Sequence, residues 1–147
     1  CGEKNYQEAE SDAEVILNAD LKKYYHLYPF LHEDELKHAL ASADLVISRA
    51  GSGSIFEIAA VGKPSILIPL FKAAQNHQTK NAYSYSEEGA CLVIEEENLT
   101  PHFFLENIRY LLSRHDELEK MSKAALEFAK PNAAKIIAEY LISYLEQ

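Results

Sequence analysis

Residues 43–58 have the sequence ADLVISRAGSGSIFEI, in which a short apolar run precedes a glycine- and serine-rich turn and a second apolar stretch. Residues 44–48 predict a buried strand, because the apolar run is short. Residues 50–54 interrupt it, and residues 55–61 predict a helix that Gly62 ends as a C-terminal cap. This order of strand, turn and helix is typical of a βαβ unit.

The same order continues toward the C-terminus. Residues 64–68 and 90–94 predict two further buried strands, and residues 77–88 predict a helix between them that ends at Gly89. Short strands that alternate with helices indicate the α/β class. We therefore expect a Rossmann-like parallel sheet with helices on both faces.

The flanking segments are predicted to be mostly helical. Residues 5–13 and 33–42 predict helices, whereas the aromatic residues 24–28 predict a strand that stops at Pro29. From Pro101 onward the pattern is helical to the end. The last helix follows Pro131, and we expect it to pack on the sheet rather than lie on a membrane surface. Its expected inner stripe consists of Ala134, Ile137, Ile142 and Leu145.

Composition limits the possible functions. The 147 residues are 48% hydrophobic, and 14 Lys and Arg against 23 Asp and Glu give a formal charge of 14 − 23 = −9. This size and apolar content favour one folded domain over residues 1–147, and the negative charge argues against a nucleic-acid partner. No apolar run approaches the roughly 20 residues of a membrane span, and no secretory signal is visible at the start.

The cysteines and histidines do not form a recognisable site. Cys1 and Cys91 lie far apart, which argues against a disulfide framework and favours a reducing cytoplasm, and Cys91 is expected to be a small core residue. The histidines lack metal-ligand spacing, so we expect no protein-held metal. The acidic residues 95–97 are interpreted as a solvated loop.

Ligands of open parallel sheets bind beyond the carboxyl ends of the strands, and residues 48–54 form one such end. Their small side chains let a ligand approach the backbone, and the start of the next helix offers N–H groups to a phosphate. Glu57, about one turn into that helix, suits the vicinal diol of a ribose better than a phosphate. Together these features suggest a nucleotide; the alternative is a tight turn followed by a surface glutamate.

Residues 69–82 form a second such end, a long loop that enters a polar helix start. His77 and Gln78 each offer a donor and an acceptor, as sugar hydroxyls require. Asn81 is expected to brace the loop by bonding its backbone. The alternative is helix capping by Asn76 with the other amides facing solvent.

Residues 43–58, 62–69, 77–82 and 88–90 resemble the MurG-type N-acetylglucosaminyl transferases of peptidoglycan synthesis, which belong to glycosyltransferase family 28. The similarity extends along the whole chain. It concerns only the C-terminal, donor-binding half of these enzymes, so it implies the C-terminal domain of the GT-B architecture. For the whole enzyme it implies an inverting transfer of N-acetylglucosamine (GlcNAc) from UDP-GlcNAc to lipid-linked N-acetylmuramic acid pentapeptide, which converts lipid I to lipid II.

The resemblance also implies roles for individual residues. Glu57 matches the glutamate that holds the ribose hydroxyls, and His77 and Gln78 match the pair that contacts GlcNAc. The turn from Arg49 to Ser52 matches the loop lining the nucleotide site, and its members are Arg49, Ala50, Gly51 and Ser52. Arg49 either neutralises the diphosphate or forms a structural ion pair. Phe30 and Leu31 resemble the segment of the family whose backbone recognises the uracil edge.

Two parts of the family pattern are absent. The Gly-Gly-Ser phosphate loop and the N-terminal acceptor domain, which carries the catalytic base and a membrane-docking patch, do not occur in the sequence. We therefore expect an N-terminally truncated, inactive UDP-sugar-binding domain with no catalytic residue and no cofactor. Its partners would be a UDP-sugar and, through the absent domain, a lipid-linked acceptor. The expected location is cytoplasmic, peripheral on the inner face of the cell membrane.

Three other functions remain open at this point. The chain could be the donor-binding subunit of a two-chain UDP-sugar transferase. It could also belong to a related transferase that makes glycolipids or exopolysaccharides. Finally, it could be a doubly wound interaction domain without a sugar site.

Overall fold

The computed structural model describes residues 2–70 and 76–145. The chain divides into two compact units, residues 1–39 and residues 40–147, and each is described by itself. The expectation of one domain over residues 1–147 stays a prediction.

The first unit consists of helices and irregular segments. It contains α1 (Glu3–Ile16), α2 (Ala19–Lys22) and most of α3 (Glu33–Ser42), which confirms both helices expected there. The strand predicted at residues 24–28 is wrong: after α2 the backbone turns, with Tyr24 N–H bonded to the Leu21 carbonyl, and then runs on irregularly. A strand needs a partner for its backbone groups, and the three described strands pair only with one another.

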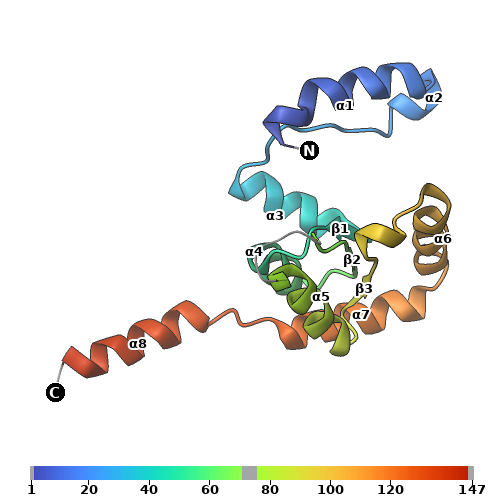
Figure 1. The fold of residues 1–147 in the computed structure, drawn as a ribbon. Coiled ribbons are helices and arrows are strands. Elements are labelled where there is room, and N and C mark those ends of the chain that lie inside the picture. The colour runs from blue at the N-terminus through green and yellow to red at the C-terminus, as the bar shows by residue number, and fades with distance from the viewer. Residues whose placement is uncertain (1, 71–75, 146–147) are drawn as a thin grey trace. The chain divides into compact units, whose positions relative to one another are not determined.

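The second unit is built on a parallel sheet. Strands β1 (Val46–Ser48), β2 (Ser65–Leu67) and β3 (Cys91–Val93) lie in the order β1-β2-β3. All neighbours are parallel, with Ile47 opposite Ile66 and Ile66 opposite Leu92. Helix α4 (Ser52–Ala60) connects the first two strands, and α5 (His77–Glu87) precedes the third. The predicted α/β class is confirmed (Figure 1).

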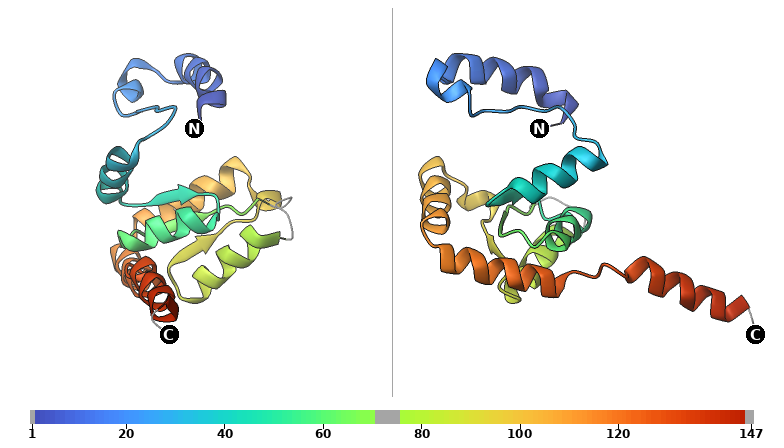
Figure 2. Two further views of the ribbon diagram at one scale, coloured as in Figure 1. Left: turned by 90° about the vertical axis from the view of Figure 1, so that its left-hand side faces the viewer. Right: turned by 180° about the vertical axis from the view of Figure 1, so that it is seen from behind.

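Helices cover both faces of this sheet, as Figure 2 shows from two further sides. On one face, Leu67 packs with Ile55 of α4 and Tyr85 of α5. On the other, Ile66 packs with Leu111 of α6 (Pro101–Leu112) and with residues of α7 (His115–Phe128). Alternate residues of a strand point to opposite faces, so one short strand contributes to both hydrophobic clusters.

Gly62 ends the segment that contains α4, as the sequence predicted. Its φ of +63° is left-handed, where a Cβ is strained, and an added Cβ would lie 2.6 Å from Leu126 Cγ of α7. The Ser122 hydroxyl of α7 also donates a 2.7 Å hydrogen bond to the Gly62 carbonyl. Because Gly62 has no side chain, α7 can lie close to the turn that connects α4 to β2.

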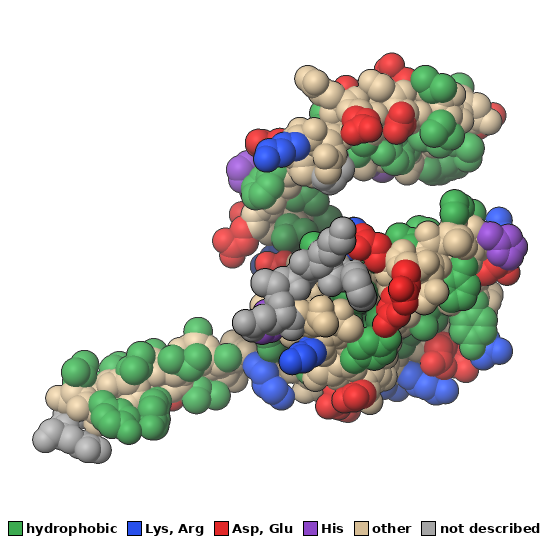
Figure 3. Space-filling model, viewed as in Figure 1, with side chains coloured by type: hydrophobic (Ala, Val, Ile, Leu, Met, Phe, Trp, Pro, Cys, Tyr) green, Lys and Arg blue, Asp and Glu red, His purple; other side chains and the backbone are tan. Residues whose placement is uncertain are grey.

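The environment of the last helix differs from the one predicted. Helix α8 (Ala133–Leu145) has no buried residue, so the prediction that its stripe from Ala134 to Leu145 packs on the sheet is wrong. Hydrophobic side chains extend along α8 in Figure 3. Both faces of the sheet are already covered by α4 to α7. Periodicity identified the apolar side of this helix but not what would cover it.

Three smaller expectations concern the described residues. Cys91 is a buried, free thiol, as predicted, whereas Cys1 lies outside the described residues. Within residues 2–70 and 76–145, no helix combines the length and apolar character needed to cross a bilayer. The same residues contain no group of three or more His, Cys, Asp and Glu side chains placed to hold a metal ion.

Candidate functional site

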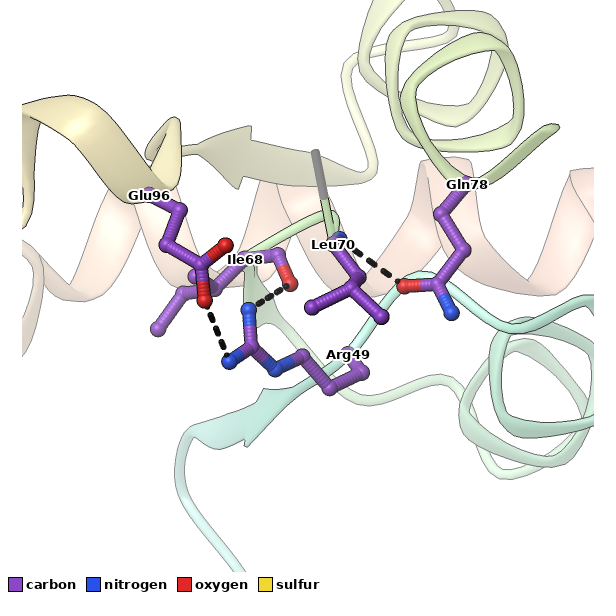
Figure 4. Close-up of polar contacts among 5 residues, drawn as sticks. All are labelled: Arg49, Ile68, Leu70, Gln78 and Glu96. Carbon is purple, nitrogen blue, oxygen red and sulfur yellow. Dashed lines mark hydrogen bonds and ion pairs between the residues drawn. The ribbon is translucent and has the colours of Figure 1, made fainter. Parts of the chain in front are cut away.

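Polar side chains gather where the three strands end, at what we call the carboxyl edge of the sheet. Arg49 directly follows β1, Ile68 directly follows β2, and Glu96 lies shortly after β3 in the short helix η2 (Glu96–Asn98). Parallel strands end at one edge of the sheet, so three segments that are distant in sequence meet there. Figure 4 shows the contacts that result.

Arg49 links all three strand ends. Its Nη1 donates to the Ile68 carbonyl at 3.3 Å, and its Nη2 lies 2.7 Å from Glu96 Oε1. Both side chains of the ion pair remain partly exposed. Of the two roles left open for Arg49, the ion pair is therefore present. The guanidinium has five N–H donors, so these contacts still leave donors for a ligand.

The loop between β1 and α4 presents backbone to the same edge. Gly51 is the N-cap of α4 and provides no side-chain hydrogen bond to the first turn. Ser52 and Gly53 are exposed, whereas Ala50 is fully buried. The first N–H groups of a helix lack intrahelical partners and carry a partial positive charge, which suits an anion such as a phosphate.

Two amide side chains brace the loops around this edge. Gln78 Oε1 accepts the Leu70 N–H at 3.0 Å, so it holds the segment that follows β2. Asn81 Nδ2 donates to the Ala50 carbonyl at 3.3 Å. Asn81 was expected to brace its own loop; the hydrogen bond of its side chain to Ala50 instead ties α5 to the neighbouring β1–α4 loop. Residues 71–75 of the long loop lie outside the described residues.

Among residues 2–70 and 76–145, no side-chain bond of this kind is seen for the other predicted site residues. Glu57 is exposed on α4, and His77 is exposed at the first position of α5. Asn76 is the N-cap of α5 but makes no side-chain cap bond, contrary to the alternative considered above. Phe30 and Leu31 belong to the first unit, where Phe30 meets His32 edge to face with ring centroids 5.3 Å apart. Their part in reading uracil stays a prediction.

The structure adds two acidic residues that the sequence assigned to a solvated loop. Glu96 pairs with Arg49, and Glu95 Oε1 accepts a 2.7 Å hydrogen bond from the Tyr83 hydroxyl of α5. That hydrogen bond, which stabilises the protonated phenol, raises the pKa of Tyr83. The acidic residues 95–97 directly follow a predicted strand. From this position in the sequence, their place at the carboxyl edge of the sheet could have been predicted.

A parallel sheet with helices on both faces and polar side chains at the carboxyl ends of its strands defines an α/β domain, and ligands of such domains bind at this edge. The family model described as "Glycosyltransferase family 28 C-terminal domain" matches residues 1–137. The chain belongs to this family.

The chain is also similar to curated enzymes of one name. A UDP-N-acetylglucosamine--N-acetylmuramyl-(pentapeptide) pyrophosphoryl-undecaprenol N-acetylglucosamine transferase of Clostridioides difficile is 39% identical over 127 residues, which are 86% of this chain and 31% of that protein. The transferase of the same name from Solibacter usitatus is 42% identical over 113 residues, or 77% of this chain and 30% of the relative. The chain thus spans about a third of the length of these relatives.

Solved structures agree on the fold. The crystal structure of Acinetobacter baumannii MurG matches with a TM-score of 0.78 and 27% identity over 97% of this chain and 40% of that one. The glycosyltransferase VinC, solved in complex with dTDP, matches with a TM-score of 0.62 and 24% identity over 81% of this chain and 27% of its own. The second likeness concerns the fold alone. The expected relation to a GT-B C-terminal domain is confirmed by the first.

Proposed function

We propose that this chain binds UDP-GlcNAc and forms the donor-binding domain of an inverting transferase. The whole protein would move GlcNAc onto lipid-linked N-acetylmuramic acid pentapeptide, the reaction named for the curated relatives. The observation that carries the proposal is the arrangement at the carboxyl edge, where Arg49, the start of α4 and the amide of Gln78 surround the strand ends.

The geometry suggests where each part of the donor would bind. The diphosphate would lie against the first N–H groups of α4 and the guanidinium of Arg49, since both offer positive charge. Glu57 would accept hydrogen bonds from the ribose hydroxyls. His77 and the amide nitrogen of Gln78 would meet the hydroxyls of the sugar, because Gln78 Oε1 is already bonded to Leu70.

In this reaction the acceptor 4-hydroxyl attacks C1 of GlcNAc, the bond from C1 to the UDP oxygen breaks, and the configuration at C1 inverts. Negative charge grows on the leaving diphosphate, and preorganised N–H donors at the start of α4 would stabilise that charge. The hydroxyl proton would pass to a base outside this chain. Since the proposed acceptor is held in lipid, we expect the whole protein to act at the inner face of the cell membrane, as a peripheral protein.

The proposal is tested by titrating the isotope-labelled chain with UDP-GlcNAc and following its backbone amide resonances, which also detect weak binding. We expect shifts in residues 49–58 and 77–81. Glu57→Ala should weaken binding at least tenfold, because two hydrogen bonds from the ribose to a charged acceptor are lost. Glu87→Ala, an exposed glutamate at the far end of α5, is the matched control and should bind as the unmodified chain does.

Two results would count against the proposal. In one, UDP-GlcNAc causes no shifts or shifts elsewhere in the chain, which would favour an interaction domain without a sugar site. In the other, the shifts occur as expected but Glu57→Ala and Glu87→Ala bind equally well. That outcome would remove Glu57 from the ribose contact while leaving a ligand at the edge.

A further inference from the structure

We propose that Glu96 is a positioning residue for the donor diphosphate, which it serves by holding the Arg49 guanidinium at the carboxyl edge of the sheet. This inference rests on the proposed function and deepens it. Glu96 lies outside the motifs that carry the family resemblance, and it acts through Arg49 rather than through the ligand.

The first support is the geometry of the two anchors. Arg49 Nη2 lies 2.7 Å from Glu96 Oε1, and Nη1 lies 3.3 Å from the Ile68 carbonyl. The anchors come from segments that follow different strands, β3 and β2, while Arg49 follows β1. Two contacts from separate elements fix the plane of the guanidinium as well as its position. A planar fork held in this way can bond a second anion through its remaining N–H groups.

The second support is that the segment carrying Glu96 is itself held in place. The Tyr83 hydroxyl of α5 donates a 2.7 Å hydrogen bond to Glu95, the N-cap residue of η2. The amides of Gln78 and Asn81, also on α5, hold the segments that follow β2 and β1. Helix α5 therefore bonds to the segments that follow all three strands. Because these segments are held in place, Glu96 has a fixed position from which it orients Arg49.

The ion pair affects the binding of a phosphate by restricting the Arg49 side chain rather than by stabilising the fold. The ion pair is partly exposed, with side-chain accessibilities of 49% and 38%, so its own contribution to folding is small. A free arginine side chain, however, must lose considerable rotamer freedom when it binds a phosphate. If Glu96 already restricts the Arg49 side chain, this conformational entropy is lost on folding rather than on ligand binding. The affinity for the diphosphate is then higher, because binding carries a smaller entropy cost.

The test compares UDP with uridine, because uridine lacks the diphosphate. Glu96→Ala should weaken UDP binding about fivefold and leave uridine binding unchanged. Glu96→Gln should stay close to the unmodified chain, because its side-chain oxygen still accepts from Arg49. The matched control is Glu97→Ala, which removes the same charge from the neighbouring exposed residue of η2 and should change neither affinity. Thermal melting checks that each variant is folded.

A double substitution adds a second readout. In an Arg49→Ala background, Glu96→Ala should have no further effect on UDP affinity, since the residue it positions is gone. Unchanged or tighter UDP binding by Glu96→Ala would overturn the proposal, and so would an equal loss of UDP and uridine binding. If the unmodified chain binds UDP but Glu96→Ala has no effect, only this inference fails; if the unmodified chain does not bind UDP, the proposed function fails with it.

Discussion

Tyr85 places a phenol in the hydrophobic core beside Phe128, with ring centroids 4.9 Å apart. Its hydroxyl is buried and has no hydrogen-bond partner among the residues that the structure describes. A buried hydroxyl without a partner costs about 1 to 3 kcal/mol. We therefore expect Tyr85→Phe to leave the free energy of unfolding unchanged or to raise it by about 1 kcal/mol. Urea unfolding measures this, and a loss above about 1 kcal/mol would indicate a hydrogen bond at this hydroxyl.

Cys91 titrates far from its usual range. Burial raises the pKa of its thiol from 9.0 to about 12. Below about pH 9 both the folded and the unfolded chain keep this proton, whereas between pH 9 and 12 only the folded chain does. The contribution of Cys91 to stability is therefore complete below pH 9 and is lost as the pH rises toward 12.

The corresponding experiment compares the unmodified chain with Cys91→Ser in urea unfolding from pH 8 to pH 11. Between pH 9 and 11, stability of the unmodified chain should fall more steeply than that of the variant, by about 1.4 kcal/mol per pH unit. Parallel pH profiles would show that the thiol is not buried in the folded chain.

Contacts between individual side chains that are distant in the sequence could not be predicted from it. Arg49 was recognised as a site residue, and both of its possible roles were left open. Its ion pair with Glu96 joins residues 47 positions apart, and no local spacing encodes such a contact. The position of Glu96 directly after a strand was visible in the sequence, but its charge alone favoured a solvated loop. The roles of Glu57 and His77 stay predictions, because only a bound ligand can show which groups these side chains contact.

At the scale of elements, prediction succeeded where two local signals agreed. Strands β1 to β3 combine short apolar runs with glycine or proline boundaries, and a glycine follows each of the helices α4 and α5 within two residues of its end. Residues 24–28 had β propensity without a partner strand, and α8 had an apolar side without a covering surface. Propensity is a local property, whereas pairing and burial depend on the rest of the molecule.

The turn at Gly62 gives a test at this scale. Gly62→Ala should lower the free energy of unfolding by about 2 to 4 kcal/mol, because it adds left-handed strain and a clash with Leu126. Gly53→Ala is the matched control: an added Cβ there meets nothing within 4 Å, and alanine favours a helix, so stability should rise by about 0.5 kcal/mol. Similar losses in both variants would argue against the close approach of α7.

For the whole molecule, the prediction from the sequence was sound for the fold class and the family but not for what surrounds the terminal helix. The two hydrophobic clusters lie within residues 40–129, and α8 adds no buried residue to either. The stability of the second unit should therefore reside in the sheet and in α4 to α7.

This distribution predicts the effect of a truncation. Removing residues 131–147 should lower the free energy of unfolding by less than about 1 kcal/mol, because no side chain of α8 leaves a buried position. Leu111→Ala, which opens a cavity in the buried cluster of α6, serves as the contrast and should cost about 2 to 5 kcal/mol. Urea unfolding of both variants measures the difference. A truncation as costly as Leu111→Ala would mean that α8 packs on the core.

The hydrogen bond from Asn81 to the Ala50 carbonyl joins helix α5 to the β1–α4 loop, between residues 31 positions apart. Loop grafting between homologues usually treats each loop as an independent module. Here a chimera that receives only the β1–α4 loop or only the start of α5 keeps this link only if the asparagine and the position of the Ala50 backbone carbonyl are both retained. An exchange of the β1–α4 loop between homologues should therefore include the start of α5 in the same cassette.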